Sequence, residues 1–264
     1  MVKVLGQRVD APTHYAPEIL ERIVRQPRDS AAGYGFDIWH LYELSWLVDS
    51  GSGQVGSSHY VGVLSIPADS VYTVESKSLK LYLNSLNCHP FASDDQALVC
   101  IRADLEAVLG VQPELSIVEP SDIRQITREP VGELLDGLIV SAPLSNGEIS
   151  LREPAGGLED VSLLTHRLRS LCPVTAQPDW ATLAISYAGP KVNRMALMAY
   201  VNSFREQQDF HERCVEAIFD RLRVSLEPES LTVVGYFQRR GGIDITPQRS
   251  IHPTEPCIYR MGRQ

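Results

Sequence analysis

The stretch Leu81-Tyr82-Leu83-Asn84-Ser85-Leu86 returns in altered form as Ala199-Tyr200-Val201-Asn202-Ser203-Phe204 in the second half of the chain. In both copies the apolar residues recur at the three- and four-residue spacing of one helix face. The apolar positions are Leu79, Leu83 and Leu86 in the first copy and Leu197, Val201 and Phe204 in the second. This repetition predicts two similarly built halves, each containing this helix.

The segments around the two helices follow one order in both halves. Strand-like segments come first, around residues 60–75 and 181–187, and a second amphipathic helix is predicted over 95–109 and 210–226. A closing strand is predicted near 114–119 and 231–239. This order is typical of an α+β fold in which both helices cover one face of an antiparallel sheet.

Turn and loop signals set the boundaries of the halves. Gly241-Gly242 separates two β-rich runs and predicts the last hairpin. Residues 132–165, rich in Gly, Pro and Ser, read as the connection between the halves. We therefore expect an N-terminal domain over 1–150 and a C-terminal domain over 151–264.

Composition limits the class of protein. The 264 residues are enough to bury a core in two modest domains, and no apolar run reaches the roughly 20 residues that a bilayer requires. Five cysteines without a CxxC pair favour a reducing compartment, so we expect a cytoplasmic protein. The formal net charge of −9 argues against a generic nucleic-acid binder but allows a local basic pocket.

A glycine-rich segment, Gly51-Ser52-Gly53-Gln54-Val55-Gly56, matches the GxGxxG dinucleotide fingerprint, and Glu75 follows at a suitable distance. That fingerprint lies between a strand and a helix, whereas these glycines lead into a strand-like run. We interpret the segment as a flexible loop, so a nicotinamide cofactor would have to bind elsewhere.

The run Leu171-Cys172-Pro173-Val174-Thr175-Ala176-Gln177-Pro178-Asp179-Trp180 holds a thiol and a carboxylate on either side of a Pro-bounded bend. A thiol acts as a nucleophile when it becomes a thiolate, and a nearby acid or base manages the proton. Taken alone, Cys172 is better explained as a buried packing residue, since free cysteines are often buried and mostly inert.

Two further segments each have a structural and a functional interpretation. Asp209 is either the N-cap of a capping box with Glu212 or part of a helix start that presents His211 and Glu212 to a ligand. The run from Glu75 to Lys80 is either a strand-to-helix junction with solvated charges or a binding segment. For Arg239-Arg240, the structural interpretation is a charged hairpin tip.

Taken together, four ordered motifs resemble one enzyme family. "ESKSLKLYLNS" from Glu75, "CPVTAQPDW" from Cys172, "FHE" from Phe210 and "RRGGIDI" from Arg239 closely resemble the long form of the NADPH-dependent 7-cyano-7-deazaguanine reductases. "DIWHLYELSWL" from Asp37 extends the resemblance over nearly the whole chain. The resemblance implies two tandem tunnelling-fold domains, and no zinc-ligand set of the related GTP cyclohydrolase I is visible.

The resemblance also assigns roles. It implies that Cys172 is the nucleophile, that Asp179 is the proton donor, and that His211 assists. The implied substrate-binding residues are Val74, Glu75, Ser76, His211 and Glu212, and the implied NADPH-binding residues are Lys77, Ser78, Lys80, Arg240 and Gly241. Two NADPH per turnover would convert a deazapurine nitrile into an amine, in the synthesis of queuosine.

Two other functions stay open on the sequence. The chain can be a non-catalytic tunnelling-fold protein that binds a purine or pterin, which predicts ligand binding without turnover. It can also be a thiol-dependent nitrile hydrolase, which predicts an acid or amide product and no use of NADPH. Because the Glu75 motif and the Cys172 motif lie in different halves, a complete site requires two copies of the fold, within one chain or across a homodimer.

Overall fold

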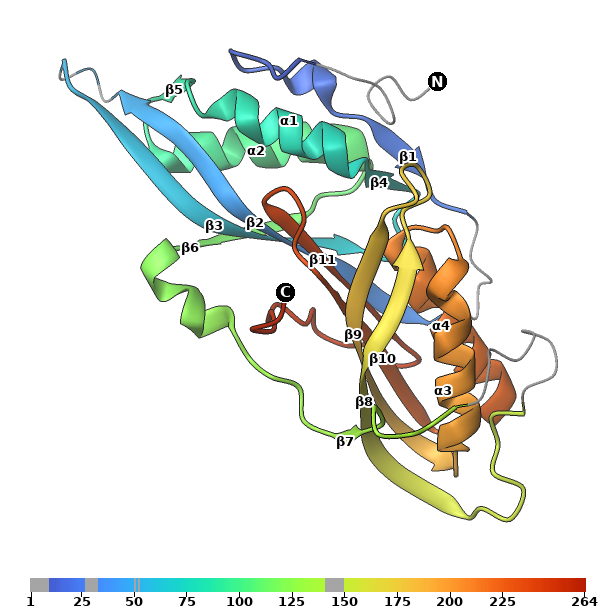
Figure 1. Cartoon of the computed structure of the whole chain (residues 1–264). Helices are drawn as coiled ribbons and strands as arrows, with labels where there is room; N and C mark the ends of the chain where they lie inside the picture. The colour runs from blue at the N-terminus through green and yellow to red at the C-terminus, as the bar shows by residue number, and fades with distance from the viewer. Residues whose placement is uncertain (1–9, 27–32, 50, 52, 141–149) are drawn as a thin grey trace. The chain divides into compact units, whose positions relative to one another are not determined.

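The computed structural model describes residues 10–26, 33–49, 51, 53–140 and 150–264 (Figure 1). These residues form two compact units. The first unit takes the described residues of 10–26, 38–127 and 239–244, and the second takes those of 33–37, 128–238 and 245–264. The hairpin at 239–244 therefore belongs to the first unit, although it lies near the end of the sequence.

The first unit places two helices on one face of a sheet (Figure 1). Strand β3 (Val55–Pro67) lies between β2 (Tyr34–Asp49) and β6 (Glu114–Val118), and it pairs antiparallel with β6 from Val61 opposite Val118. The shorter elements are η1 (Pro17–Ile19), β1 (Arg22–Val24), β4 (Tyr72–Val74), β5 (Pro90–Phe91) and η2 (Pro120–Ile126).

The helices of this unit are α1 (Ser76–Leu86) and α2 (Asp94–Leu109). Helix α2 begins where Ser93 Oγ accepts a hydrogen bond from the Gln96 N–H at 3.2 Å, and it ends at Gly110, whose φ of 71° lies in the left-handed region. Both helices turn their apolar stripe inward, with Leu79, Leu83 and Leu86 of α1 and Leu98, Ile101, Leu105 and Leu109 of α2 all buried.

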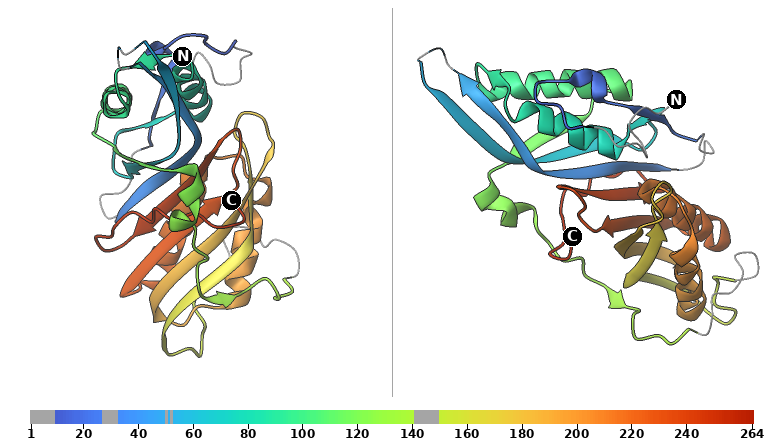
Figure 2. Two further views of the ribbon diagram at one scale, coloured as in Figure 1. Left: turned by 90° about the vertical axis from the view of Figure 1, so that its left-hand side faces the viewer. Right: turned by 45° about the horizontal axis from the view of Figure 1, so that its top comes forward.

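The second unit repeats this arrangement. Its sheet contains β8 (Leu158–Leu171), β9 (Pro178–Pro190), β10 (Ser230–Phe237) and β11 (Ile243–Ser250), each antiparallel to the next, and β7 (Glu133–Leu134) runs parallel to β8. Figure 2 shows α3 (Arg194–Ser203) and α4 (His211–Leu226) on one face of these strands, with η3 (Phe204–Glu206) between them in the chain. Their buried residues form one core with the facing side chains of the strands.

A buried ion triad fixes α4 to strands of the second unit. The guanidinium of Arg249 is fully buried and donates from Nη1 to Asp37 Oδ1 at 2.8 Å and from Nη2 to Glu216 Oε1 at 2.8 Å. Burial alone would lower the pKa of Arg249, but the charges of Asp37 and Glu216 raise it above its ordinary value. Because Glu216 lies one turn after Glu212, the triad holds the start of α4 in place.

The predicted α+β fold class is confirmed, since each unit contains a sheet with antiparallel pairing and two helices in the predicted order. In two places the structure differs from the expectations. Residues 158–165, predicted as part of the connection, are the first half of β8, where residues 158–162 alternate between exposed and partly buried. The 16-residue strand β2 was not anticipated as an element. Gly51 and Gly53 lie between two strands, as expected of a loop.

Part of the expected connection, residues 141–149, lies outside the described residues, as do residues 50 and 52 of the glycine-rich segment. The expected domain boundary at 150 directly follows such a segment and stays a prediction. Among the helices that the structure describes, none combines the length and apolar character needed to cross a bilayer.

Candidate active site

The Cys172 motif forms the hairpin between β8 and β9 in the second unit. Leu171 pairs with Pro178 in register, so Cys172 directly follows one strand and Asp179 lies at the start of the next. The loop is closed by hydrogen bonds from Cys172 N to the Gln177 carbonyl at 2.8 Å and from Ala176 N to the Cys172 carbonyl at 3.0 Å.

This loop also carries backbone strain. Ala176 has a φ of 53°, which lies in the left-handed region. This conformation is energetically unfavourable for any residue other than glycine. Strained conformations persist where the surrounding structure enforces them, and they are frequent at functional sites. The loop is therefore built to hold Cys172, which is 8% exposed, in one place.

The start of α4 lies against the same hairpin. Leu171 N donates to the Gln207 carbonyl at 2.8 Å, and Asp209 N donates to the Leu171 carbonyl at 3.1 Å. The capping-box interpretation of Asp209 and Glu212 is wrong, because the N-cap is Phe210 and no side chain caps the helix. Asp209 Oδ1 accepts from the Phe210 N–H instead, and Glu212 is buried in the first turn of the helix.

The side chains of Asp179 and His211 are in contact at this helix start. His211 Nε2 lies 3.2 Å from Asp179 Oδ2, and the two side chains are 16% and 4% exposed. The imidazole stacks on the ring of Phe237, with centroids 3.9 Å apart and planes 7° apart. Buried ring nitrogens normally have a partner, yet His211 Nδ1 is buried without one among the described residues. A bound ligand can supply that partner.

Phe237 was not predicted as a site residue. It is fully buried at the end of β10, two residues before the Arg239-Arg240 pair, and it forms the surface on which the His211 ring rests. No local signal in the sequence distinguishes it from an ordinary core phenylalanine, because its role depends on pairing between β9 and β10.

Cys214 is the other buried thiol among the described cysteines, one turn into α4. Burial raises the pKa of Cys214 to about 12, so it stays protonated near neutral pH and is a poor nucleophile. This makes Cys214 a suitable comparison for Cys172 in chemical labelling.

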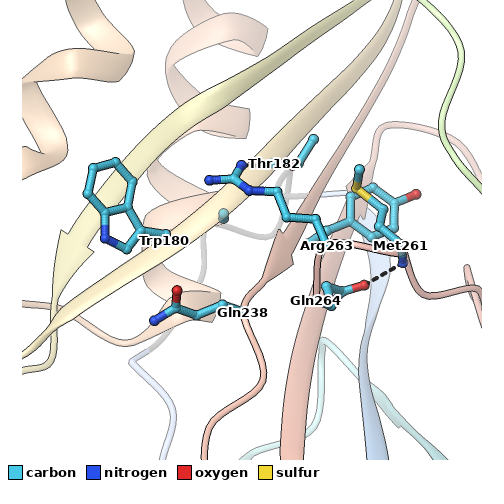
Figure 3. A pocket seen from close by; sticks show the side chains of 8 residues that line it. Trp180, Thr182, Gln238, Met261, Arg263 and Gln264 are labelled. Atoms are coloured by element: carbon cyan, nitrogen blue, oxygen red, sulfur yellow. Dashed lines mark hydrogen bonds between the residues drawn. The ribbon is translucent and has the colours of Figure 1, made fainter.

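A small pocket lies on the opposite face of the same strands (Figure 3). Ala181 and Leu183 belong to the core under the helices, so Asp179 shares the helix face and Trp180 points to the other. The polar groups of this pocket already bond within the protein: Arg263 Nη1 donates to the His166 carbonyl at 3.0 Å, and Gln264 Nε2 donates to the Phe237 carbonyl at 3.1 Å. These hydrogen bonds attach the C-terminal residues Arg263 and Gln264 to the strands β8 and β10.

The predicted substrate residue Glu75 lies in the first unit, as the N-cap of α1 directly after Val74 and β4. Its Oε1 accepts from the Lys77 N–H at 2.9 Å and its Oε2 from the Ser78 N–H at 2.7 Å. Glu75 is 1% exposed, so the expectation of a solvated charge is wrong for this residue. The junction of strand and helix, with Ser76 as the first helical residue, is as expected.

The predicted cofactor residues Lys80 and Gly241 lie together in the first unit. A side chain placed on Gly241 would put its Cβ 3.3 Å from Cδ and Cε of Lys80 and 3.5 Å from Nζ. Gly241 has a φ of 62°, and Arg240 N donates to the Ile243 carbonyl at 2.8 Å, which closes the hairpin. The glycine thus allows the Lys80 side chain to lie directly against the hairpin, which brings an ammonium group to the hairpin tip.

Known proteins and family profiles match this chain over most of its length. A family profile described as "Nitrile reductase, 7-cyano-7-deazaguanine-reductase N-term" matches residues 12–117, and one described as "QueF-like protein" matches residues 178–255. A protein of Acinetobacter baumannii (strain SDF) named "NADPH-dependent 7-cyano-7-deazaguanine reductase" is 39% identical over 99% of this chain and 98% of its own length. The chain belongs to the 7-cyano-7-deazaguanine reductase family.

A second member of the reductase family, with the same name, comes from Desulfotalea psychrophila (strain LSv54 / DSM 12343) and is 37% identical over 98% of this chain and 96% of its own length. The solved structure of an apo archaeosine synthase QueF-Like aligns with 39% of this chain and all of that chain, at 14% identity and a TM-score of 0.31. Cys172 lies between the two segments that the family profiles match, whereas Glu75, Asp179 and His211 lie inside them.

Proposed function

We propose that this protein reduces the nitrile 7-cyano-7-deazaguanine to 7-aminomethyl-7-deazaguanine with NADPH, in queuosine synthesis. The observation that carries this proposal is the strained hairpin that holds Cys172 and Asp179, with Asp179 paired to His211 at 3.2 Å. The names of relatives that align over nearly the full chain support the choice of substrate.

Cys172 makes the nitrile reducible. Its thiolate adds to the nitrile carbon, so that a C–S bond forms and one of the C–N π bonds becomes a lone pair on nitrogen. Asp179, with His211 beside it, donates a proton to that nitrogen, which gives a neutral thioimide. Covalent addition replaces one difficult step with easier ones.

When bound, NADPH supplies hydride, and two are needed because a nitrile gains four electrons on its way to an amine. After the first reduction the C–S bond breaks and the electron pair returns to the Cys172 sulfur, which leaves an imine for the second reduction. The pair of Asp179 and His211 returns protons to nitrogen. Water must be excluded meanwhile, because an imine hydrolyses readily.

Two buried carboxylates are suited to bind the deazaguanine by hydrogen bonds. Glu75 is 1% exposed and Glu212 is 7% exposed, and carboxylate oxygens accept strong hydrogen bonds from the N–H groups of an amino-pyrimidine ring. Glu75 is already fixed by two backbone N–H groups at a helix start, so its oxygens are held in position for further acceptance. Val74 and Ser76 flank it.

The basic groups near the hairpin suit the phosphates of NADPH. Lys80 lies against Gly241, and Arg240 is next in the chain. Lys77 and Ser78 lie in the first turn of α1, where the helix dipole favours negative charge. We further propose a cytoplasmic homodimer without nucleic-acid or membrane partners, and sedimentation of the purified protein measures its oligomeric state.

The decisive experiment uses intact-protein mass spectrometry with 7-cyano-7-deazaguanine and no NADPH. Wild type and Cys214→Ala should gain the full mass of the nitrile, and Cys172→Ala should not. Adding NADPH should then give the amine with two NADPH oxidised for each nitrile. Binding without an adduct points to the non-catalytic binder, and an acid or amide formed without NADPH oxidation points to the hydrolase. Either result overturns the proposal.

A further inference from the structure

Asp244 is a buried carboxylate two residues after Gly242, at which the hairpin 239–242 ends. It is 1% exposed, and its Oδ1 lies 2.6 Å from Nδ1 of the fully buried His40. Its Oδ2 accepts a short hydrogen bond from the Tyr42 hydroxyl. Because a buried carboxylate is costly unless its oxygens are satisfied, both contacts are needed to keep Asp244 where it is.

The two partners of Asp244 lie on β2, which also binds the hairpin directly. Tyr42 N donates to the Gly242 carbonyl at 2.9 Å. The guanidinium of Arg239 lies 4.2 Å from the centre of the Tyr42 ring, and Arg239 also forms an ion pair with Glu43. Tyr42 therefore contacts the start of the hairpin through its ring and the end of it through its backbone and hydroxyl.

The tip between these anchors has little stiffness of its own. Gly241 and Gly242 have φ angles of 62° and 81°, and glycine samples many other conformations with little cost. A binding loop that must first be ordered binds more weakly than one already ordered, because ordering costs conformational entropy. The contacts at Asp244 and Tyr42 supply that order in advance.

Arg239 attaches the hairpin to β2. Arg239 is engaged from two sides, by the face of the Tyr42 ring and by the carboxylate of Glu43. Those contacts make Arg239 part of the attachment of the hairpin to β2. Gly241 lies against the Lys80 side chain instead, so we place the proposed phosphate contacts on that side of the tip.

We infer that Asp244, through His40 and Tyr42, is a positioning residue that holds the hairpin 239–242 in the conformation that binds NADPH. The inference rests on the proposed function for the identity of the cofactor. The cluster acts on cofactor affinity and leaves the reaction of the nitrile with Cys172 unchanged, because that residue lies in the other unit.

The test compares NADPH binding with nitrile addition in the same variants. Isothermal titration with NADPH should give a dissociation constant at least about tenfold higher for Asp244→Asn than for wild type. Tyr42→Phe keeps the ring under Arg239 but loses the hydroxyl, and should bind NADPH about fivefold more weakly, the effect of one lost hydrogen bond of about 1 kcal/mol. Both variants should form the nitrile adduct at the wild-type rate.

Asp94→Asn is the matched control. Asp94 belongs to the same unit and accepts from Trp46 Nε1 at 2.8 Å and from the Tyr60 hydroxyl at 2.9 Å, so it has the same kind of carboxylate contacts away from the hairpin residues. Its variant should lose thermal stability but bind NADPH as wild type does.

Three results overturn the inference. These are an NADPH dissociation constant within twofold of wild type in Tyr42→Phe, an equal loss of NADPH binding in Asp94→Asn, and a parallel loss of adduct formation in Asp244→Asn. If Asp244→Asn does not fold, Tyr42→Phe alone decides. If wild type forms no adduct, the proposed function fails; if it forms the adduct and Tyr42→Phe binds NADPH normally, only the positioning role fails.

Discussion

Replacing Arg249 by methionine should strongly destabilise the second unit. The substitution keeps much of the side-chain volume but removes the cation between Asp37 and Glu216, which are 0% and 6% exposed. Asp37 and Glu216 would then lose the buried cation that they share, and Glu216 would keep Arg213, whose Nη1 lies 3.0 Å from its Oε2 near the surface. Breaking a buried ion pair in this way typically costs about 3–5 kcal/mol. Since whole domains are stable by about 5–15 kcal/mol, the loss should be about a fifth or more of the total.

Urea denaturation followed by circular dichroism measures this loss directly. Arg249→Met should lower the free energy of unfolding by about 3–5 kcal/mol. The triple variant Arg249→Met, Asp37→Asn, Glu216→Gln should recover part of it, because neutral groups are cheaper to bury than unpaired charges. A single variant that loses less than about 1 kcal/mol, or a triple variant less stable than the single one, would refute this account of the triad.

Three further predictions concern the site and the charges around it. Asp179→Asn should still form the nitrile adduct but reduce it about a hundredfold more slowly or worse, as expected for a missing general acid; single-turnover kinetics measure this. Glu212→Ala should weaken nitrile binding by about 1–3 kcal/mol and leave NADPH binding unchanged in isothermal titration. Burial alone would raise the pKa of Glu159, but hydrogen bonds from Arg194 and the Val192 N–H lower it. The stability that Glu159 contributes is therefore present at neutral pH and lost as the pH falls through its lowered pKa, so the difference in melting temperature between wild type and Glu159→Gln should shrink in acid.

Each of these predictions has a result that contradicts it. Near-normal turnover in Asp179→Asn removes that residue from proton transfer. An equal loss of nitrile and NADPH affinity in Glu212→Ala, with a lower melting temperature, indicates that the helix start has collapsed. For Glu159, a melting-temperature difference that stays constant from neutral to acid pH shows that its ionisation is not linked to folding.

The helices were predictable from sequence because their signals are local. The stripe of Leu98, Ile101, Leu105 and Leu109 repeats at helical spacing, and the structure has α2 over Asp94–Leu109. Strand β2 was harder, because most of its central residues are buried whichever way they point and the alternation that identifies a strand is lost. The prediction of Asp209 as an N-cap was wrong for a related reason. The backbone N–H of Asp209 donates to the carbonyl of Leu171 on β8, a partner far away in sequence.

The sequence predicted which residues form the candidate site better than it predicted how they are arranged. Motif identity was enough to name Cys172, Asp179 and His211, and the structure brings Asp179 and His211 into contact. Phe237 under the imidazole and Lys80 against Gly241 depend on which strands and loops meet, and spacing along the chain carries no information about that. The catalytic and binding roles of these residues remain predictions until the variants are measured.

The membership of residues 239–244 in the first unit has a consequence for folding during synthesis. Domains generally fold in order as the chain leaves the ribosome, N-terminal first. Here the first unit is incomplete until the ribosome has made nearly all of the second, because Tyr42 and His40 find their partner in Asp244. Contacts of such long sequence separation form slowly, since a long loop must close first. The nascent N-terminal unit therefore stays incomplete, with the rings of His40 and Tyr42 and the edge of β2 exposed to water, until residues 239–244 are synthesised.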